Sequence, residues 1–166
     1  MKVFRKYHLF PFLLFLFLFI DGQITFIVSR IIPLPYEAIS FLFFYGFMIL
    51  SLYFSEVACI WLGIFLGFCF DVYFLHTIGV AFILFPLLQL IFYRWNQVIL
   101  LNRLSRFFTF LLTILAFQFF SYFLEILIIG IKFEWIVILV FKMAPSLLFN
   151  FFLIIMLQPL FEKIYL

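Results

Sequence analysis

The sequence predicts an all-α fold: a polytopic membrane helical bundle of six transmembrane helices, forming a single domain over residues 1–166. The first observation is composition. The chain is 70% hydrophobic and only 10% charged, whereas a water-soluble domain is about 45–50% apolar and about 25% charged. The second is size, because a globular core in a chain this short leaves too much surface to hide such an excess. Lipid is therefore the expected solvent.

The first span is predicted over residues 9–28. It follows a basic start, as a signal peptide would, but no small-residue cleavage site comes after it. The apolar run ends before Arg30 and Pro33, where a charge and a helix-breaking residue interrupt it. We therefore expect a transmembrane helix here.

The next apolar stretch, residues 39–70, is ambiguous by hydropathy alone. As one helix it would be about 48 Å long, although the hydrocarbon core of a bilayer is only about 30 Å thick. As two helices, each would be short, and the turn between them would contain neither Gly nor Pro.

Charge decides between these alternatives. Cytoplasmic loops carry an excess of Lys and Arg, and two segments of this chain are basic. If both are cytoplasmic, an even number of spans separates them, so the stretch forms two spans, residues 39–53 and 56–71. Both termini are then expected in the cytoplasm. The basic residues are Lys2, Arg5 and Lys6 at the start, and Arg94, Arg103 and Arg106 after the fourth span.

The remaining three spans are plainer. The fourth is predicted over residues 78–93 and ends at Arg94, and the fifth over residues 107–129, after Arg106. The sixth is predicted over residues 136–157, between Trp135 and Pro159. Each run is close to the 20 or so apolar residues that a spanning helix needs.

Four ionisable residues on four different spans are expected at one depth beneath the outer surface. An ionisable group inside a membrane costs at least about 2.5 kcal/mol, so each requires a reason. We predict an intramembrane polar cluster of Asp21, Glu125 and Lys142, in which the lysine neutralises one of the carboxylates. The fourth residue, Asp71, ends the third span.

The polar residues near this cluster follow helical spacing. Lys142, Ser146 and Asn150 stand four apart on the sixth span, with Pro145 between them. Two readings stay open: a substrate or ion site, and a set of interhelical hydrogen bonds and helix caps. The second is favoured, because no alternating-access or proton-relay pattern is present. One face of the fifth span carries Gln118, Ser121, Tyr122 and Glu125.

A small-residue motif marks the third span. Gly63 and Gly67 lie four residues apart, and Asp71 follows after four more. Glycines at this spacing flatten one face of a helix, so that another backbone can approach closely. Gly79 then follows a short loop and opens the fourth span.

Taken in order, these features resemble the MreD family of the bacterial cell-elongation machinery. Residues 61–71, with the Gly-x-x-x-Gly-x-x-x-Asp pattern, and Gly79 resemble the family's third helix and the loop after it. Tyr-Phe-Leu-Glu at residues 122–125 resembles its fifth helix. Ala-Pro-Ser-Leu-Leu-Phe-Asn at residues 144–150, ending at Pro159, is similar to its sixth. The resemblance covers the whole chain.

The resemblance implies a non-enzymatic scaffold of the cytoplasmic membrane that regulates cell shape and lateral peptidoglycan synthesis. Its partners would be an MreC-like protein, a RodA-type glycosyltransferase and a class B penicillin-binding protein, with MreB added in rods. The fold would be similar to the substrate-binding subunits of energy-coupling-factor transporters. The residues expected to pack helices or bind partners are Gly63, Gly67, Asp71, Gly79, Pro145 and Asn150.

Two other function classes are less favoured. A substrate-binding subunit of a vitamin-type transporter would carry an alanine-rich docking face on its first helix, but no alanine precedes Ala38. An intramembrane enzyme would need a catalytic set, and no Ser/His/Asp arrangement, metal-ligand pair or phosphate-binding loop is present. No cofactor and no metal are expected. The net charge of +3 is spread along the chain, so no nucleic-acid partner is expected either.

Overall fold

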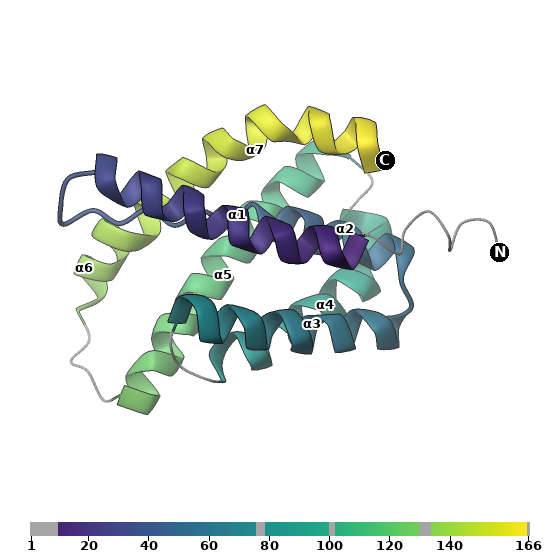
Figure 1. Ribbon diagram of the computed structural model, residues 1–166, viewed down its shortest axis with the longest axis horizontal. Coiled ribbons are helices and arrows are strands. Elements are labelled where there is room, and N and C mark those ends of the chain that lie inside the picture. Colours follow the sequence, from purple (N-terminus) through teal and green to yellow (C-terminus); the bar gives the residue numbers. More distant parts are fainter. Residues whose placement is uncertain (1–9, 76–78, 100–101, 130–133, 166) are drawn as a thin grey trace.

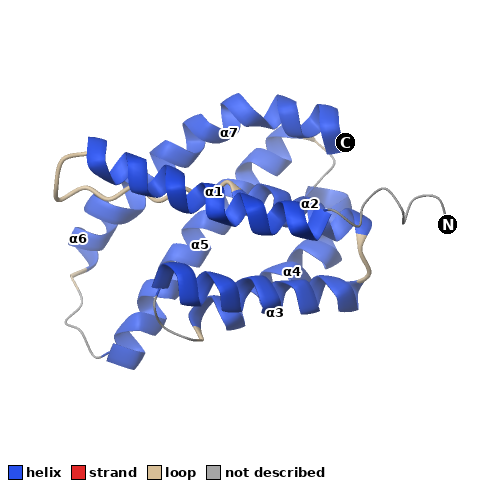
Figure 2. Cartoon of the chain, in the orientation of Figure 1, coloured by secondary structure: helices blue, strands red, loops and turns tan. Residues whose placement is uncertain are grey.

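The computed structural model describes residues 10–75, 79–99, 102–129 and 134–165, and this part of the chain is a bundle of helices (Figures 1 and 2). The predicted all-α membrane fold is confirmed. Five regular helices come first in the chain: α1 (Phe10–Ile31), α2 (Phe43–Tyr53), α3 (Glu56–Phe70), α4 (Val80–Ile99) and α5 (Arg103–Ile129).

Two helices contain a π-helical stretch. A segment labelled η1 (Asp71–Leu75) extends α3. The sixth helix is built from α6 (Trp135–Ile138), the π-helical η2 (Leu139–Met143) and α7 (Ala144–Tyr165). Pro145 has no backbone N–H, and its ring would clash with the preceding turn of a regular α-helix. The wider spacing of η2 relieves this clash, so the helix continues through the proline.

Within the described residues, five helices are long and apolar enough to cross a membrane. The exception is α2, whose 11 residues extend about 16 Å, roughly half of the hydrocarbon thickness. The helix begins at Phe43, although helix was expected from residue 39. Residues 36–41 before it have no regular secondary structure. Two helices therefore fill the stretch over which hydropathy left the choice open, and the first crosses only half of the bilayer by itself.

The core of the bundle is built around α2. Residues 41–51 are all buried, and α2 packs against α1, α4 and α5. In Figure 1, α1 runs across the front of the view between α7 and α3, with α2 behind it. Rings from four segments meet at α2, and their burial excludes both lipid and water from the centre. The central rings are Phe43, Phe44, Phe47, Phe70, Phe85 and Phe117.

Candidate functional site

The segment before α2 runs through the bundle without regular secondary structure, so most of its backbone groups lack helical hydrogen bonds. We call residues 37–42 the buried segment, although the Glu37 side chain at its start is exposed. Its first bond comes from the sixth helix. Pro145 cannot donate to the carbonyl four residues before it, so the Phe141 oxygen is free, and it accepts from the Glu37 N–H at 2.8 Å. The proline that interrupts one helix thereby provides an acceptor for another segment.

Asn150 and Ser146 hold the same segment from the sixth helix. The Asn150 side-chain oxygen accepts from the Phe41 N–H at 2.8 Å, and its amide donates to the Ile39 carbonyl at 2.7 Å. The Ser146 hydroxyl oxygen accepts from the Ile39 N–H at 3.1 Å. Both side chains are fully buried. In lipid an irregular backbone is tolerated only when its polar groups are satisfied in this way.

From the opposite side, α1 completes this arrangement. The Asp21 carboxylate accepts from the Phe43 N–H at 2.6 Å and from the Ser40 hydroxyl. The Thr25 hydroxyl oxygen accepts from the Ser40 N–H at 2.9 Å. Asp21 therefore caps the first turn of α2, where a negative charge also complements the helix dipole. We call the four side chains that hold the buried segment the clasp: Asp21, Thr25, Ser146 and Asn150.

Asp71 performs a similar task at the start of α4. Its carboxylate accepts from three backbone N–H groups, those of Gly79 at 2.8 Å, Ala81 at 2.7 Å and Phe82 at 3.0 Å. Gly79 has a φ of +127°, a conformation that residues with a side chain rarely adopt. The aspartate and the glycine thus act together to turn the chain into α4.

The glycine pair of α3 packs against α4 of the same chain. A methyl group at Gly67 would lie 2.8 Å from the Ala81 carbonyl carbon and 3.0 Å from Cα of Phe82. At Gly63 it would lie 3.0 Å from Cα of Pro86. These neighbours are backbone atoms, which cannot rotate away. The flattened face expected for helix packing is therefore occupied within the molecule, and α4 covers it.

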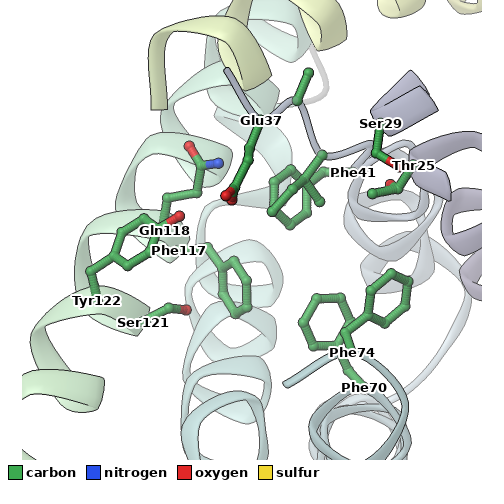
Figure 3. A pocket seen from close by; sticks show the side chains of 12 residues that line it. Thr25, Ser29, Glu37, Phe41, Phe70, Phe74, Phe117, Gln118, Ser121 and Tyr122 are labelled. Atoms are coloured by element: carbon green, nitrogen blue, oxygen red, sulfur yellow. The ribbon is translucent and has the colours of Figure 1, made fainter. Parts of the chain in front are cut away.

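A cavity lies beside the buried segment. Its volume is about 320 Å³, and Figure 3 shows polar side chains of α5 on one side and the rings of Phe70 and Phe74 on the other. Within the described residues, no group of three or more His, Cys, Asp or Glu side chains could hold a metal ion. The cavity is lined by Thr25, Ser29, Glu37, Ala38, Ile39, Phe41, Phe70, Phe74, Phe117, Gln118, Ser121 and Tyr122.

Comparison with known proteins identifies the family of this chain. The family model for the rod shape-determining protein MreD matches residues 3–166. The chain belongs to the MreD family. It is 31% identical over 151 residues to the cell shape-determining protein MreD of Streptococcus pneumoniae (strain ATCC BAA-255 / R6), covering 90% of this chain and 91% of that one.

Family membership supports a role in cell shape, and the five long apolar helices make this MreD-family chain a multi-pass membrane protein. No solved structure matches it. The expected likeness to the substrate-binding subunits of energy-coupling-factor transporters therefore stays a prediction.

Two of the three residues expected to form the polar cluster of this MreD-family chain have partners in the described structure, and these partners differ. Lys142 pairs with Glu37, with the ammonium nitrogen 3.2 Å from the carboxylate, and it lies over the Tyr122 ring. Asp21 instead binds the start of α2. The side chain of Glu125 lies outside the described residues. Lysine and aspartate thus hold two different points of the chain leading into α2, rather than neutralising each other.

Sequence reasoning did not single out Thr25, Ser40 or Glu37. A signal existed for Thr25, because it follows Asp21 by four residues and so lies on the same face of α1. No local signal marked Ser40 or Glu37, whose partners lie on other helices. The family motif at residues 144–150 did contain two of the four clasp residues, Ser146 and Asn150, without indicating what they hold.

Proposed function

We propose that this chain is a non-enzymatic membrane scaffold of the cell-elongation machinery. It binds an MreC-like protein in the cytoplasmic membrane and, with it, a RodA-type glycosyltransferase and a class B penicillin-binding protein. Both chain termini face the cytoplasm. This orientation is supported by the start of α1 and the end of α7, which lie at the same end of the bundle (right in Figure 1).

The hydrogen bonds of the buried carboxylates support a scaffold rather than a catalytic site. Asp21 and Asp71 both accept hydrogen bonds from the backbone of their own chain. A catalytic acid or base must instead be placed toward a reacting group. Both carboxylates hold helix ends in position, and the result is a fixed framework whose outer faces are available to other proteins.

One residue on α1 carries the proposal. Gln23 is exposed on the outside of the bundle and makes no hydrogen bond within the described part of the chain. It lies about 12 Å along the helix from Ile31, at a depth where lipid offers no hydrogen-bonding groups. Around it the exposed side chains are apolar, among them Phe19, Phe26 and Ile27. α1 is also the least buried of the five long helices.

An exposed amide at this depth is satisfied when a second helix brings a polar group to it, as happens between membrane helices. We therefore assign the α1 face around Gln23 to the transmembrane helix of the MreC-like partner. Lipid covers the remaining apolar faces. The glycine face of α3 is excluded from this role, because α4 fills it.

The test is co-purification from native membranes with a tagged chain that carries Gln23→Leu. One interhelical hydrogen bond contributes about 0.6–2 kcal/mol, so recovery of the MreC-like partner should fall by about 3-fold to 30-fold. Thermal stability should be unchanged, because the Gln23 side chain makes no hydrogen bond within the described part of its own chain. Gln97→Leu, the same change at an exposed position of α4, is the matched control and should leave recovery intact.

Equal recovery of the partner by Gln23→Leu and the control would remove α1 as the docking helix. Recovery of an ATPase coupling module, in place of cell-wall synthases, would overturn the scaffold function itself and indicate transport.

A further inference from the structure

The cavity beside the buried segment contains polar atoms that the fold does not satisfy. Gln118 is 3% exposed and Ser121 is 6% exposed, and neither atom of the Gln118 amide nor the Ser121 hydroxyl has a hydrogen-bond partner in the described structure. Leaving such a group unpaired costs about 1–3 kcal/mol. Buried groups without partners are rare in native proteins, so these three atoms require an explanation.

A second buried glutamine of the bundle is satisfied at its nitrogen, although its oxygen also lacks a partner in the described structure. The Gln89 amide donates to the Phe47 carbonyl at 2.7 Å, and so links α4 to α2. Gln118 has no equivalent link, although it is as deeply buried. The difference is its position, because Gln118 and Ser121 line an open volume rather than a packed interface.

Position on α5 directs both side chains to this volume. Ser121 follows Gln118 by three positions, so the two share one face of the helix, about one turn apart. Figure 3 shows this face opposite Phe70 and Phe74, with Glu37 and Phe41 between the two sides. A molecule in the cavity would therefore have hydrogen-bonding groups on one side and aromatic rings on the other.

The chemistry of the lining defines the ligand. A carboxamide both donates and accepts, as does a hydroxyl, so the complementary group must do both and carry no charge. The one carboxylate in the lining, Glu37, is already paired with Lys142. The apolar part of the lining includes four phenylalanine rings, those of Phe41, Phe70, Phe74 and Phe117, and they favour an apolar, ring-shaped body.

We propose that this cavity is a binding site for an uncharged molecule that has a compact apolar body and one carboxamide or hydroxyl group. Gln118 and Ser121 hydrogen-bond the polar group, and the phenylalanine rings enclose the body. The site is separate from the α1 docking face and does not depend on the scaffold function. The neutral polar group comes either from a membrane lipid or from a small molecule in solution.

The test uses 3-phenylpropanamide, whose ring and carboxamide match the two sides of the cavity, with the full-length protein in lipid nanodiscs. Titration followed by ligand-detected NMR should show saturable binding. Gln118→Leu should weaken that binding by at least about fivefold, because it removes two hydrogen bonds. Ser121→Ala, which deletes a single oxygen, should weaken it less and is a second variant that preserves the fold.

Two controls isolate the polar contact. Thr113→Val removes a buried hydroxyl of α5 that donates to the Thr109 carbonyl, outside the cavity, and should bind the probe as the wild type does. n-Butylbenzene, which has the apolar body without the carboxamide, should bind the wild type and Gln118→Leu equally. No saturable binding by the wild type, either with its lipids or after delipidation, would mean that the cavity holds only water, and this would overturn the proposal. Equal affinity of the wild type, Gln118→Leu and Ser121→Ala for 3-phenylpropanamide would also overturn it.

The same titration distinguishes the two sources of the ligand. It is repeated on protein extracted into polymer discs with its native lipids, and again after delipidation. Binding of the probe only after delipidation would support the proposal with a lipid as the natural occupant. Binding in both preparations would support it with a ligand taken from solution.

Discussion

The clasp and the cavity lie side by side and bury polar side chains to a similar extent, but they use those side chains differently. Asp21 and Asn150 of the clasp are 2% and 0% exposed, and Gln118 and Ser121 of the cavity are 3% and 6% exposed. The clasp carboxylate and amide are bonded to the backbone of the buried segment and α2. The polar atoms of Gln118 and Ser121 are bonded to nothing in the described structure.

The difference follows from the backbone that each region faces. The buried segment has no regular secondary structure, so its N–H and C=O groups need partners that the segment cannot supply itself. Around Gln118 the chain is regular helix, whose backbone is already satisfied. A polar side chain there serves no structural group. In this bundle, polar side chains that are buried to a similar extent therefore differ in how far their own chain satisfies them.

The largest expected effect comes from breaking the clasp at Asp21. Asp21→Leu leaves the N–H groups of Phe43 and Leu42 and the Ser40 hydroxyl without an acceptor. At about 1–3 kcal/mol for each buried group, the loss is about 3 kcal/mol or more. We expect little monodisperse protein after extraction, measured by size-exclusion chromatography. Asp21→Asn, which keeps one acceptor oxygen, should lose less, and accumulation of Asp21→Leu at the wild-type level would contradict the structural role.

An intermediate effect is expected at Asn150. Asn150→Leu removes the acceptor for the Phe41 N–H and the donor to the Ile39 carbonyl, so it should destabilise the fold by about 2–4 kcal/mol. The midpoint of thermal unfolding in detergent should fall clearly below that of the wild type. An unchanged midpoint would mean that the buried segment is held without the amide.

The smallest effect on stability is expected at Gln118, where the same amide-to-leucine change is made. Because the Gln118 amide has no partner to lose, stability should lie between no change and about 1 kcal/mol of gain. The midpoint of thermal unfolding, measured beside Asn150→Leu, should stay level or rise. Equal losses of stability for Gln118→Leu and Asn150→Leu would contradict the distinction between clasp and cavity.

Part of the site could be predicted from local patterns. The glycines of the third helix indicated close packing, and Pro145 and Asn150 stood out through their resemblance to a family motif. The partners of Asn150 could not be predicted, because it hydrogen-bonds Phe41 and Ile39, which lie 109 and 111 positions earlier in the chain. Lys142 was expected to neutralise Glu125 or Asp21. It pairs instead with Glu37, which precedes α2 in the chain and lies against the sixth helix.

The sequence by itself determined that the chain lives in lipid, that it is helical, and which polar residues need a partner there. These follow from composition and from the cost of an ionisable or polar group in hydrocarbon. Only the tertiary structure decided that residues 39–41 are not helical, because a buried irregular segment and a buried helix can be equally apolar in sequence. It also decided which polar groups are satisfied, since hydrogen bonding depends on where distant backbone atoms come to lie.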